Sequence, residues 1–173
     1  MALMVEDGSI VANADSYATV ADWTTYATSM GWTLTGDAAS QEADMRRSYA
    51  FLNREYTYLG RRTDAAQTGQ FPRFFDEPID GFSVASDSIP TPIIEAQYEI
   101  AWLFNQGNDL FAYTSGAAVK RKKEKVDVIE EETEYFTGSD VQARILAVEG
   151  LLRPYISGSQ PGQNSGNIPL VRG

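Results

Sequence analysis

Residues 89–107 read IPTPIIEAQYEIAWLFNQG, and this stretch organises the rest of the chain. Thr91 and Pro92 predict the start of a helix, with the threonine as its cap and the proline at the first helical position. Beyond them, apolar residues fall on more than one helical face as far as Gly107, which is a natural stop. A helix that is apolar on several faces has to be buried on several sides. We therefore expect it to be the central helix, or one that packs on two partners.

Three further helices are predicted around it. The first begins at Thr19, whose hydroxyl can accept a backbone N–H, and ends at Gly31. The last begins with the capping box Ser139-Asp140-Val141-Gln142 and ends at Pro154. The second ends at Gly60 and carries a single apolar stripe with 4-3-4-3 spacing, formed by Met45, Tyr49, Leu52, Tyr56 and Leu59. Its off-stripe arginines, Arg46, Arg47 and Arg54, fit either a solvated face or a subunit interface.

The connection over residues 60–90 is long, and loops of this length are usually functional or held by a partner. It contains an aromatic knot, Phe71-Pro72-Arg73-Phe74-Phe75. Three phenylalanines argue against a free, solvated loop. We predict that the knot packs onto the domain or onto a neighbouring subunit, with subunit or tail contacts from Phe71, Arg73, Phe74 and Phe75.

An arm over residues 117–136 contains AVKRKKEKVDVIEEETEY (residues 118–135), in which the charge changes sign abruptly. Its period of two and its β-branched centre predict strand-like chain. If the arm folds into a hairpin, its basic half can lie opposite its acidic half, and in a ring the same charges could match subunit to subunit. We expect subunit or tail contacts from the charged residues Lys120, Arg121, Lys122, Lys123, Lys125, Glu130, Glu132 and Glu134.

The end of the chain changes character at Ser157. Residues 157–167 have the Gly, Ser, Gln, Asn and Pro composition of a flexible linker. The last residues are apolar and extended, and we predict that they dock on a partner by adding a strand to an exposed sheet edge: Ile168, Pro169, Leu170, Val171 and Arg172. The sequence thus divides into a helical domain, residues 1–156 including the arm, and a docking tail, residues 157–173. The predicted fold class is mainly α: a small bundle of about four helices with a long loop, an extended arm or hairpin, and an extended tail.

Composition excludes several kinds of chemistry. The 173 residues include no cysteine and no histidine, so thiolate catalysis, Cys/His zinc sites and imidazole bases are ruled out. No glycine-rich phosphate loop is present, and the run Glu130-Glu131-Glu132 is linear where a hard cation needs converging oxygens. We expect no enzyme, no cofactor and no metal site. Without a signal peptide or a membrane-spanning run, the chain is expected to act from the cytoplasm.

The charge balance is acidic, with 14 basic and 24 acidic residues giving −10. Without residues 120–125 there are 9 basic and 23 acidic residues, or −14. Such a surface repels a phosphate backbone, so general DNA binding is disfavoured, although a local basic strip could still contact DNA.

A series of motifs covers residues 5–156 in order: VEDGSIVANADSYATVADWTTYA, the helical segment from Arg47 to Tyr56, Gln70-Phe71-Pro72-Arg73, IPTPIIEAQYEIA, VKRKKEKVDVIEEETEY and LLRPYI. Their order resembles the head–tail adaptor (connector) proteins of tailed bacteriophages. The same sequence family is also labelled DnaT-like and single-stranded-DNA-binding.

The resemblance implies a structural virion protein, assembled in the host cytoplasm and located at the head–tail junction. It implies a ring, twelve-fold in this family, beneath the portal protein and around the channel through which double-stranded viral DNA passes without specific binding. The carboxyl-terminal extension would reach toward the portal, and a stopper, tail-terminator or nozzle protein would bind on the other side. No membrane is involved.

The rival hypothesis is a single-stranded-DNA-binding module that uses the basic cluster of residues 120–125. Tyr113 or Tyr135 would then serve as stacking platforms for bases. Its affinity would fall with salt as expected for several phosphate contacts.

Overall fold

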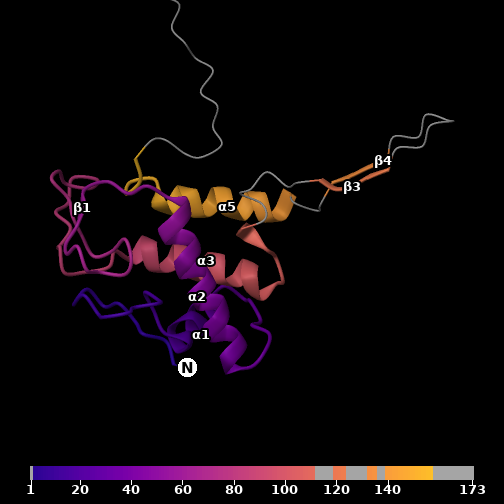
Figure 1. The fold of residues 1–173 in the computed structure, drawn as a ribbon, viewed down its shortest axis with the longest axis horizontal. Helices are drawn as coiled ribbons and strands as arrows, with labels where there is room; N and C mark the ends of the chain where they lie inside the picture. The colour runs from indigo at the N-terminus through magenta and orange to yellow at the C-terminus, as the bar shows by residue number, and fades with distance from the viewer. Residues whose placement is uncertain (1, 112–118, 124–131, 136–138, 158–173) are drawn as a thin grey trace, which may run out of the picture.

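The computed structural model describes residues 2–111, 119–123, 132–135 and 139–157. Helix α3 (Thr91–Asn105) is central, because α1 (Val20–Ser29), α2 (Ala38–Glu55) and α5 (Ser139–Leu152) all pack against it. Figure 1 shows α3 running beneath α5, with α2 crossing both helices. The residues of α3 are buried on several faces, from Ile93 to Phe104. The predicted central helix and the mainly helical fold class are confirmed.

The start of α3 differs from the prediction. The N-cap is Pro90, Thr91 is the first helical residue, and no side chain caps the helix. The cap position matters less here because Pro92 has no N–H and so removes one of the donors that a cap would satisfy. The first turn closes instead through the carbonyl of Pro90, which accepts from Ile93 N at 2.9 Å.

Helix α1 begins where the sequence predicted. The hydroxyl of Thr19 accepts from the backbone N–H of Asp22 at 3.1 Å, and the Asp22 carboxylate accepts from the backbone N–H of Thr19. The two hydrogen bonds form a capping box. The helix ends before Gly31, which has φ +72°. Trp23 is fully buried, and its Nε1 donates to the carbonyl of Tyr98 at 3.1 Å, which fixes α1 on α3.

Helix α2 ends one turn earlier than predicted. Met45, Tyr49 and Leu52 are buried as expected, but the C-cap is Tyr56, in extended conformation, and Leu59 is exposed. The reason is a tertiary pairing with the end of the chain. The N–H of Leu59 donates to the carbonyl of Tyr155 at 2.8 Å, and the N–H of Ser157 donates to that of Thr57 at 2.9 Å, so the backbone of this turn is satisfied without helix.

The long connection forms an irregular end to the body. Strand β1 (Arg61–Arg62) pairs antiparallel with β2 (Arg73–Phe74), as Figure 1 shows at the edge remote from the hairpin. Gly60 has φ +66°, and a Cβ there would lie 2.2 Å from the carbonyl oxygen of Phe74, so the close approach of the two segments requires glycine.

Helix α5 packs its apolar residues on α3 and stops before Pro154, as predicted. Its core residues Val141, Val148 and Leu152 join those of α2 and α3 in one hydrophobic cluster. A second cluster, which includes Trp23 and Met45, fills the space around α1. The aliphatic chain of Ile94 packs against both clusters and links them.

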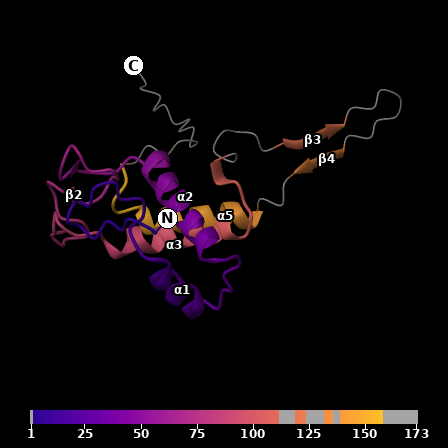
Figure 2. The same cartoon turned by 60° about the horizontal axis from the view of Figure 1, so that its bottom comes forward.

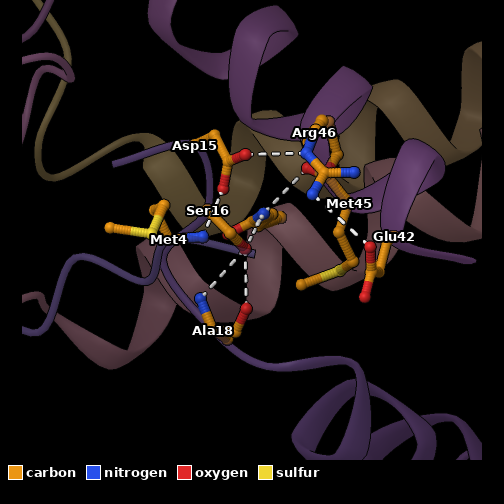
Figure 3. A network of polar contacts seen from close by, with 9 residues as sticks. Met4, Asp15, Ser16, Ala18, Glu42, Met45 and Arg46 are labelled. Atoms are coloured by element: carbon orange, nitrogen blue, oxygen red, sulfur yellow. Dashed lines mark hydrogen bonds and ion pairs between the residues drawn. The ribbon is translucent and has the colours of Figure 1, made fainter. Parts of the chain in front are cut away.

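Polar contacts, drawn in Figure 3, hold the amino-terminal segment and join it to α2. Asp15 accepts from Met4 N at 2.7 Å and forms an ion pair with Arg46 at 2.7 Å. The Ser16 hydroxyl donates to the carbonyl of Ala18 at 2.6 Å. The ion pair with Arg46 attaches the segment to α2, while the other two bonds connect residues within the segment.

The predicted arm is a hairpin. Strand β3 (Val119–Lys123) pairs antiparallel with β4 (Glu132–Tyr135), and both figures draw the two strands clear of the helical body, beyond α5 (Figures 1 and 2). The predicted tail, except for Ser157, lies outside the described residues.

Candidate functional site

The first candidate surface is the β3–β4 hairpin, which brings the two charged halves of the arm together. Its register places Arg121 opposite Glu134 and Lys123 opposite Glu132. Lys120 and Lys122 also lie on β3. The predicted opposition of the basic and acidic halves is therefore confirmed at the level of the backbone. Lys125, Glu130 and the stacking candidate Tyr113 fall outside the described residues, while Tyr135 lies opposite Val119.

The aromatic knot divides into a buried part and a surface part. Phe71 is completely buried and contacts Tyr17 and Tyr58 edge to face, with ring centroids 6.2 and 4.9 Å apart. Phe75 is half-buried on Tyr155, and Phe74 is 41% exposed. The knot therefore packs onto its own domain, which was one of the two predicted outcomes.

Arg73 is 6% exposed and organises this end of the fold. Its guanidinium donates to the backbone carbonyls of Tyr58, Leu59, Gly60 and Gln70, and to the Gln70 side chain, over distances of 2.7–3.2 Å. Burial lowers the pKa of Arg73 from its usual value. Its contacts are internal, and Phe74 is the residue of the knot that exposes the most apolar surface.

Phe74 is covered on one side by Arg61, whose guanidinium carbon lies 4.2 Å from the ring centroid. Arg61 also forms an exposed ion pair with Asp76 at 3.0 Å. Phe82, further along the same loop, is 76% exposed. The sequence identified the Phe71–Phe75 knot but did not single out Phe82, which stands alone between Gly81 and Ser83 and carries no periodic signal.

Arginines of the helical body, defined here as residues 2–111 and 139–157, mostly contact groups of the same chain. The body holds eight basic and eighteen acidic residues, for a net charge of −10. Seven of the eight arginines have such a contact: Arg46 with Asp15, Arg47 with Asp44, Arg54 with the Phe111 ring, Arg61 with Asp76, Arg62 with the Gln67 carbonyl, Arg73 as described above, and Arg144 with Glu99. Most of the positive charge of the body is thus already engaged by carboxylates, carbonyls and rings.

A half-buried aromatic cluster joins α1, α3 and α5, and sequence reasoning missed it. Trp32 stacks on Trp102 with ring centroids 4.9 Å apart and planes at 18°, and the guanidinium carbon of Arg144 lies 4.8 Å from the Trp32 ring. Glu99 accepts from Arg144 at 3.2 Å and from the Tyr26 hydroxyl at 3.1 Å. Burial, followed by the charge of Glu99, raises the pKa of Tyr26. In the sequence, the one signal that could have pointed to this cluster was Trp32, which directly follows the helix stop Gly31.

A cavity of about 290 Å³ opens between α2 and the end of α3. Its walls combine the charged side chains of Arg47 and Asp109 with the rings of Phe104 and Phe111. In the part of the chain that the structure describes, no group of three acidic side chains could hold a metal ion, and no helix is long and apolar enough to cross a membrane.

A family model described as "Putative DnaT-like ssDNA binding protein" matches residues 1–173. The chain belongs to this family. The match spans the amino-terminal segment, the four helices, the charged hairpin and the tail. It agrees with the DnaT-like label noted in the sequence analysis. No curated protein and no solved structure matches the chain. The family's description names single-stranded DNA and no component of a virion.

Proposed function

We propose that the chain is a structural, non-catalytic virion protein, a head–tail adaptor that forms a ring beneath the portal and surrounds the DNA channel. The observation that carries the proposal is the internal use of the body's arginines, together with the −10 charge of that body. Phosphate binding needs cations that can exchange counterions for phosphates. A body in which seven of eight arginines have partners, and whose excess charge is negative, suits a channel through which DNA slides without sticking.

Three surfaces supply the proposed contacts. The hairpin projects away from the body, Phe74 and Phe82 present apolar rings on the loop at the other end, and the predicted tail begins at Ser157. The tail would reach the portal through Ile168, Leu170 and Val171. The hairpin and the loop would face neighbouring subunits or a stopper, tail-terminator or nozzle protein.

Purified full-length chain mixed with portal protein tests the proposal. We expect a ring-shaped density on the portal in negative-stain images and a matching mass by light scattering. A chain that stays monomeric and has no affinity for portal would reject the adaptor function.

The tail has its own variants. A chain truncated after Ser157 retains the Ser157–Thr57 hydrogen bond and should unfold like the full chain while losing portal attachment. The triple variant Ile168→Ser, Leu170→Ser, Val171→Ser should behave in the same way. The matched control, Ser159→Ala with Gln163→Ala in the linker, should attach normally. Unchanged attachment of the truncated chain would reject the portal anchor.

A second candidate function is single-stranded DNA binding, which the family description favours. Four of the five residues of β3 are basic, and the cavity beside Arg47 is lined by the half-buried ring of Phe111, on which a base could stack. Fluorescence anisotropy with labelled oligothymidylate at low ionic strength tests this function. Binding that weakens steeply with salt, and that is lost when Lys120, Arg121, Lys122 and Lys123 are all changed to Gln but retained in Arg153→Gln, would support it. No binding of the unaltered chain at low salt would eliminate it.

A further inference from the structure

The two edges of the hairpin carry opposite charge. Strand β3 reads VKRKK and strand β4 reads ETEY, and in the described part of the chain the two form a sheet of two strands. Each strand pairs with the other along one side, which leaves its second side as an edge with backbone N–H and C=O groups available to a further strand. One edge of this small sheet is therefore basic and the other is acidic.

This asymmetry selects the way in which two hairpins can meet. A two-fold contact would place β3 against β3 or β4 against β4, and like charges directly opposite each other are destabilising. A head-to-tail contact would place the basic β3 of one copy beside the acidic β4 of the next. Because β3 and β4 are antiparallel within each hairpin, a row of hairpins in one orientation also keeps antiparallel pairing between copies.

We propose that β3 of one copy docks beside β4 of the next copy, so that the hairpins of neighbouring subunits form one continuous antiparallel sheet with strands of alternating charge. A head-to-tail contact of this kind generates a ring when its rotation closes. The proposal rests on the ring of the proposed function, and it assigns the subunit contact within that ring to two strands of defined sequence.

A second copy fits these edges better than a nucleic acid does. Neighbouring strands of a sheet lie about 5 Å apart, less than the Debye length of about 8 Å at physiological salt, so a DNA strand bound along β3 would also come close to the acidic strand β4. Phosphates would therefore feel the cations and the anions together. The β4 strand of a neighbouring copy brings acidic residues to β3. On its other side, that β4 pairs with the basic β3 of its own hairpin.

Two charge-reversal variants of the full chain test the contact. The all-acidic variant carries Lys120→Glu, Arg121→Glu, Lys122→Glu and Lys123→Glu, which makes both strands acidic. The all-basic variant carries Glu132→Lys and Glu134→Lys, which makes both strands basic. The matched control combines all six substitutions in one chain and restores opposite edges with the signs exchanged. Thermal unfolding of the helical body should be the same in all three, because the hairpin lies apart from it.

We expect that neither the all-acidic nor the all-basic variant forms the ring on portal by itself. Their 1:1 mixture should form it, and the six-substitution control should assemble like the unaltered chain. The mixture is decisive, because its hairpins have like charges within each chain and opposite charges only between chains. Assembly of each single variant on its own would overturn the edge contact and leave the adaptor function standing. Failure of the mixture when the control assembles would also overturn it, since the charges would then act within one hairpin.

A capture experiment without portal separates the two proposals. Tagged all-acidic variant should retain untagged all-basic variant at low ionic strength and release it at 1 M salt, where the Debye length is about 3 Å. If the variants retain each other but the unaltered chain does not bind portal, the adaptor function is rejected and the edge contact stands. No retention at low salt would overturn the edge contact.

Discussion

Gln97 of α3 and Ser16 of the amino-terminal segment, 81 positions apart, are joined by a hydrogen bond of 2.9 Å from Nε2 to Oγ. The same amide donates to the carbonyl of Met45 in α2 at 3.0 Å and accepts from the N–H of Tyr17 at 2.8 Å. Gln97 is completely buried. One side chain thus connects the central helix with α2 and with the segment before α1.

Replacing Gln97 with leucine should destabilise the fold by about 1–3 kcal/mol, because the N–H of Tyr17 would be left buried without a partner, whereas the carbonyl of Met45 keeps its bond from the Ser48 hydroxyl. Urea unfolding measures the change. Gln106→Leu, at the exposed C-cap of the same helix, should stay within about 0.5 kcal/mol. Equal losses for the two variants would contradict the proposed role of Gln97.

Arg73→Lys should cost about 2–3 kcal/mol although it keeps the charge. The guanidinium reaches four backbone carbonyls from a planar fork, whereas an ammonium is a single point with three donors. Thermal unfolding measures the loss. Arg61→Lys on the exposed β1 strand is the control, with an effect below about 1 kcal/mol. An Arg73→Lys chain as stable as the control would show that the fork geometry is dispensable.

Gly60→Ala and Gly107→Ala separate backbone strain from steric clash. Both glycines have positive φ, +66° and +81°, but a Cβ at Gly60 would lie 2.2 Å from the Phe74 carbonyl oxygen, while at Gly107 it meets nothing within 4 Å. Gly107→Ala should therefore cost about 1–2 kcal/mol from φ alone. Gly60→Ala should cost at least about 1 kcal/mol more, since β2 has to move. Chemical denaturation of both variants provides the measurement.

Asp44 gives a pH dependence of known sign. Burial raises its pKa above the ordinary value, against the opposing effects of the Asn105 hydrogen bond at 2.9 Å and of Arg47. The folded state thus binds the proton more tightly than the unfolded state, so the contribution of Asp44 is most favourable at low pH and falls as pH rises from 3.8 through the raised pKa.

We therefore expect Asp44→Asn, which keeps an acceptor for Asn105, to match the parent at acidic pH and to gain stability relative to it near neutrality. The gain should not exceed about 1 kcal/mol, because the weak ion pair with the exposed Arg47 is also lost. Unfolding free energies measured from pH 3 to pH 7 test this expectation. The exposed Asp87→Asn is the control. A relative stability that falls with rising pH would reverse the sign and reject the argument.

The sequence alone determined the features that depend on neighbours along the chain. The capping box of Thr19, the stop at Gly31, the burial of α3 on several faces and the opposition of the two charged halves of the arm all follow from spacing of a few residues. Side chains at these spacings share a helical face or a strand face whatever the rest of the fold does. The family membership is also a property of the sequence alone, since the family model matches residues 1–173.

Only the tertiary structure decided the features that depend on distant partners. The last turn of α2 is absent because residues 57–59 hydrogen-bond with residues 155–157, about a hundred positions away. Arg73 is buried by the carbonyls around Gly60, and Trp32, just after α1, contacts Arg144 of α5. Helical periodicity places Leu59 on a buried stripe, but it carries no information about which distant backbone will satisfy the same N–H. A buried donor takes the partner that the assembled fold supplies, and that choice lies outside any local pattern.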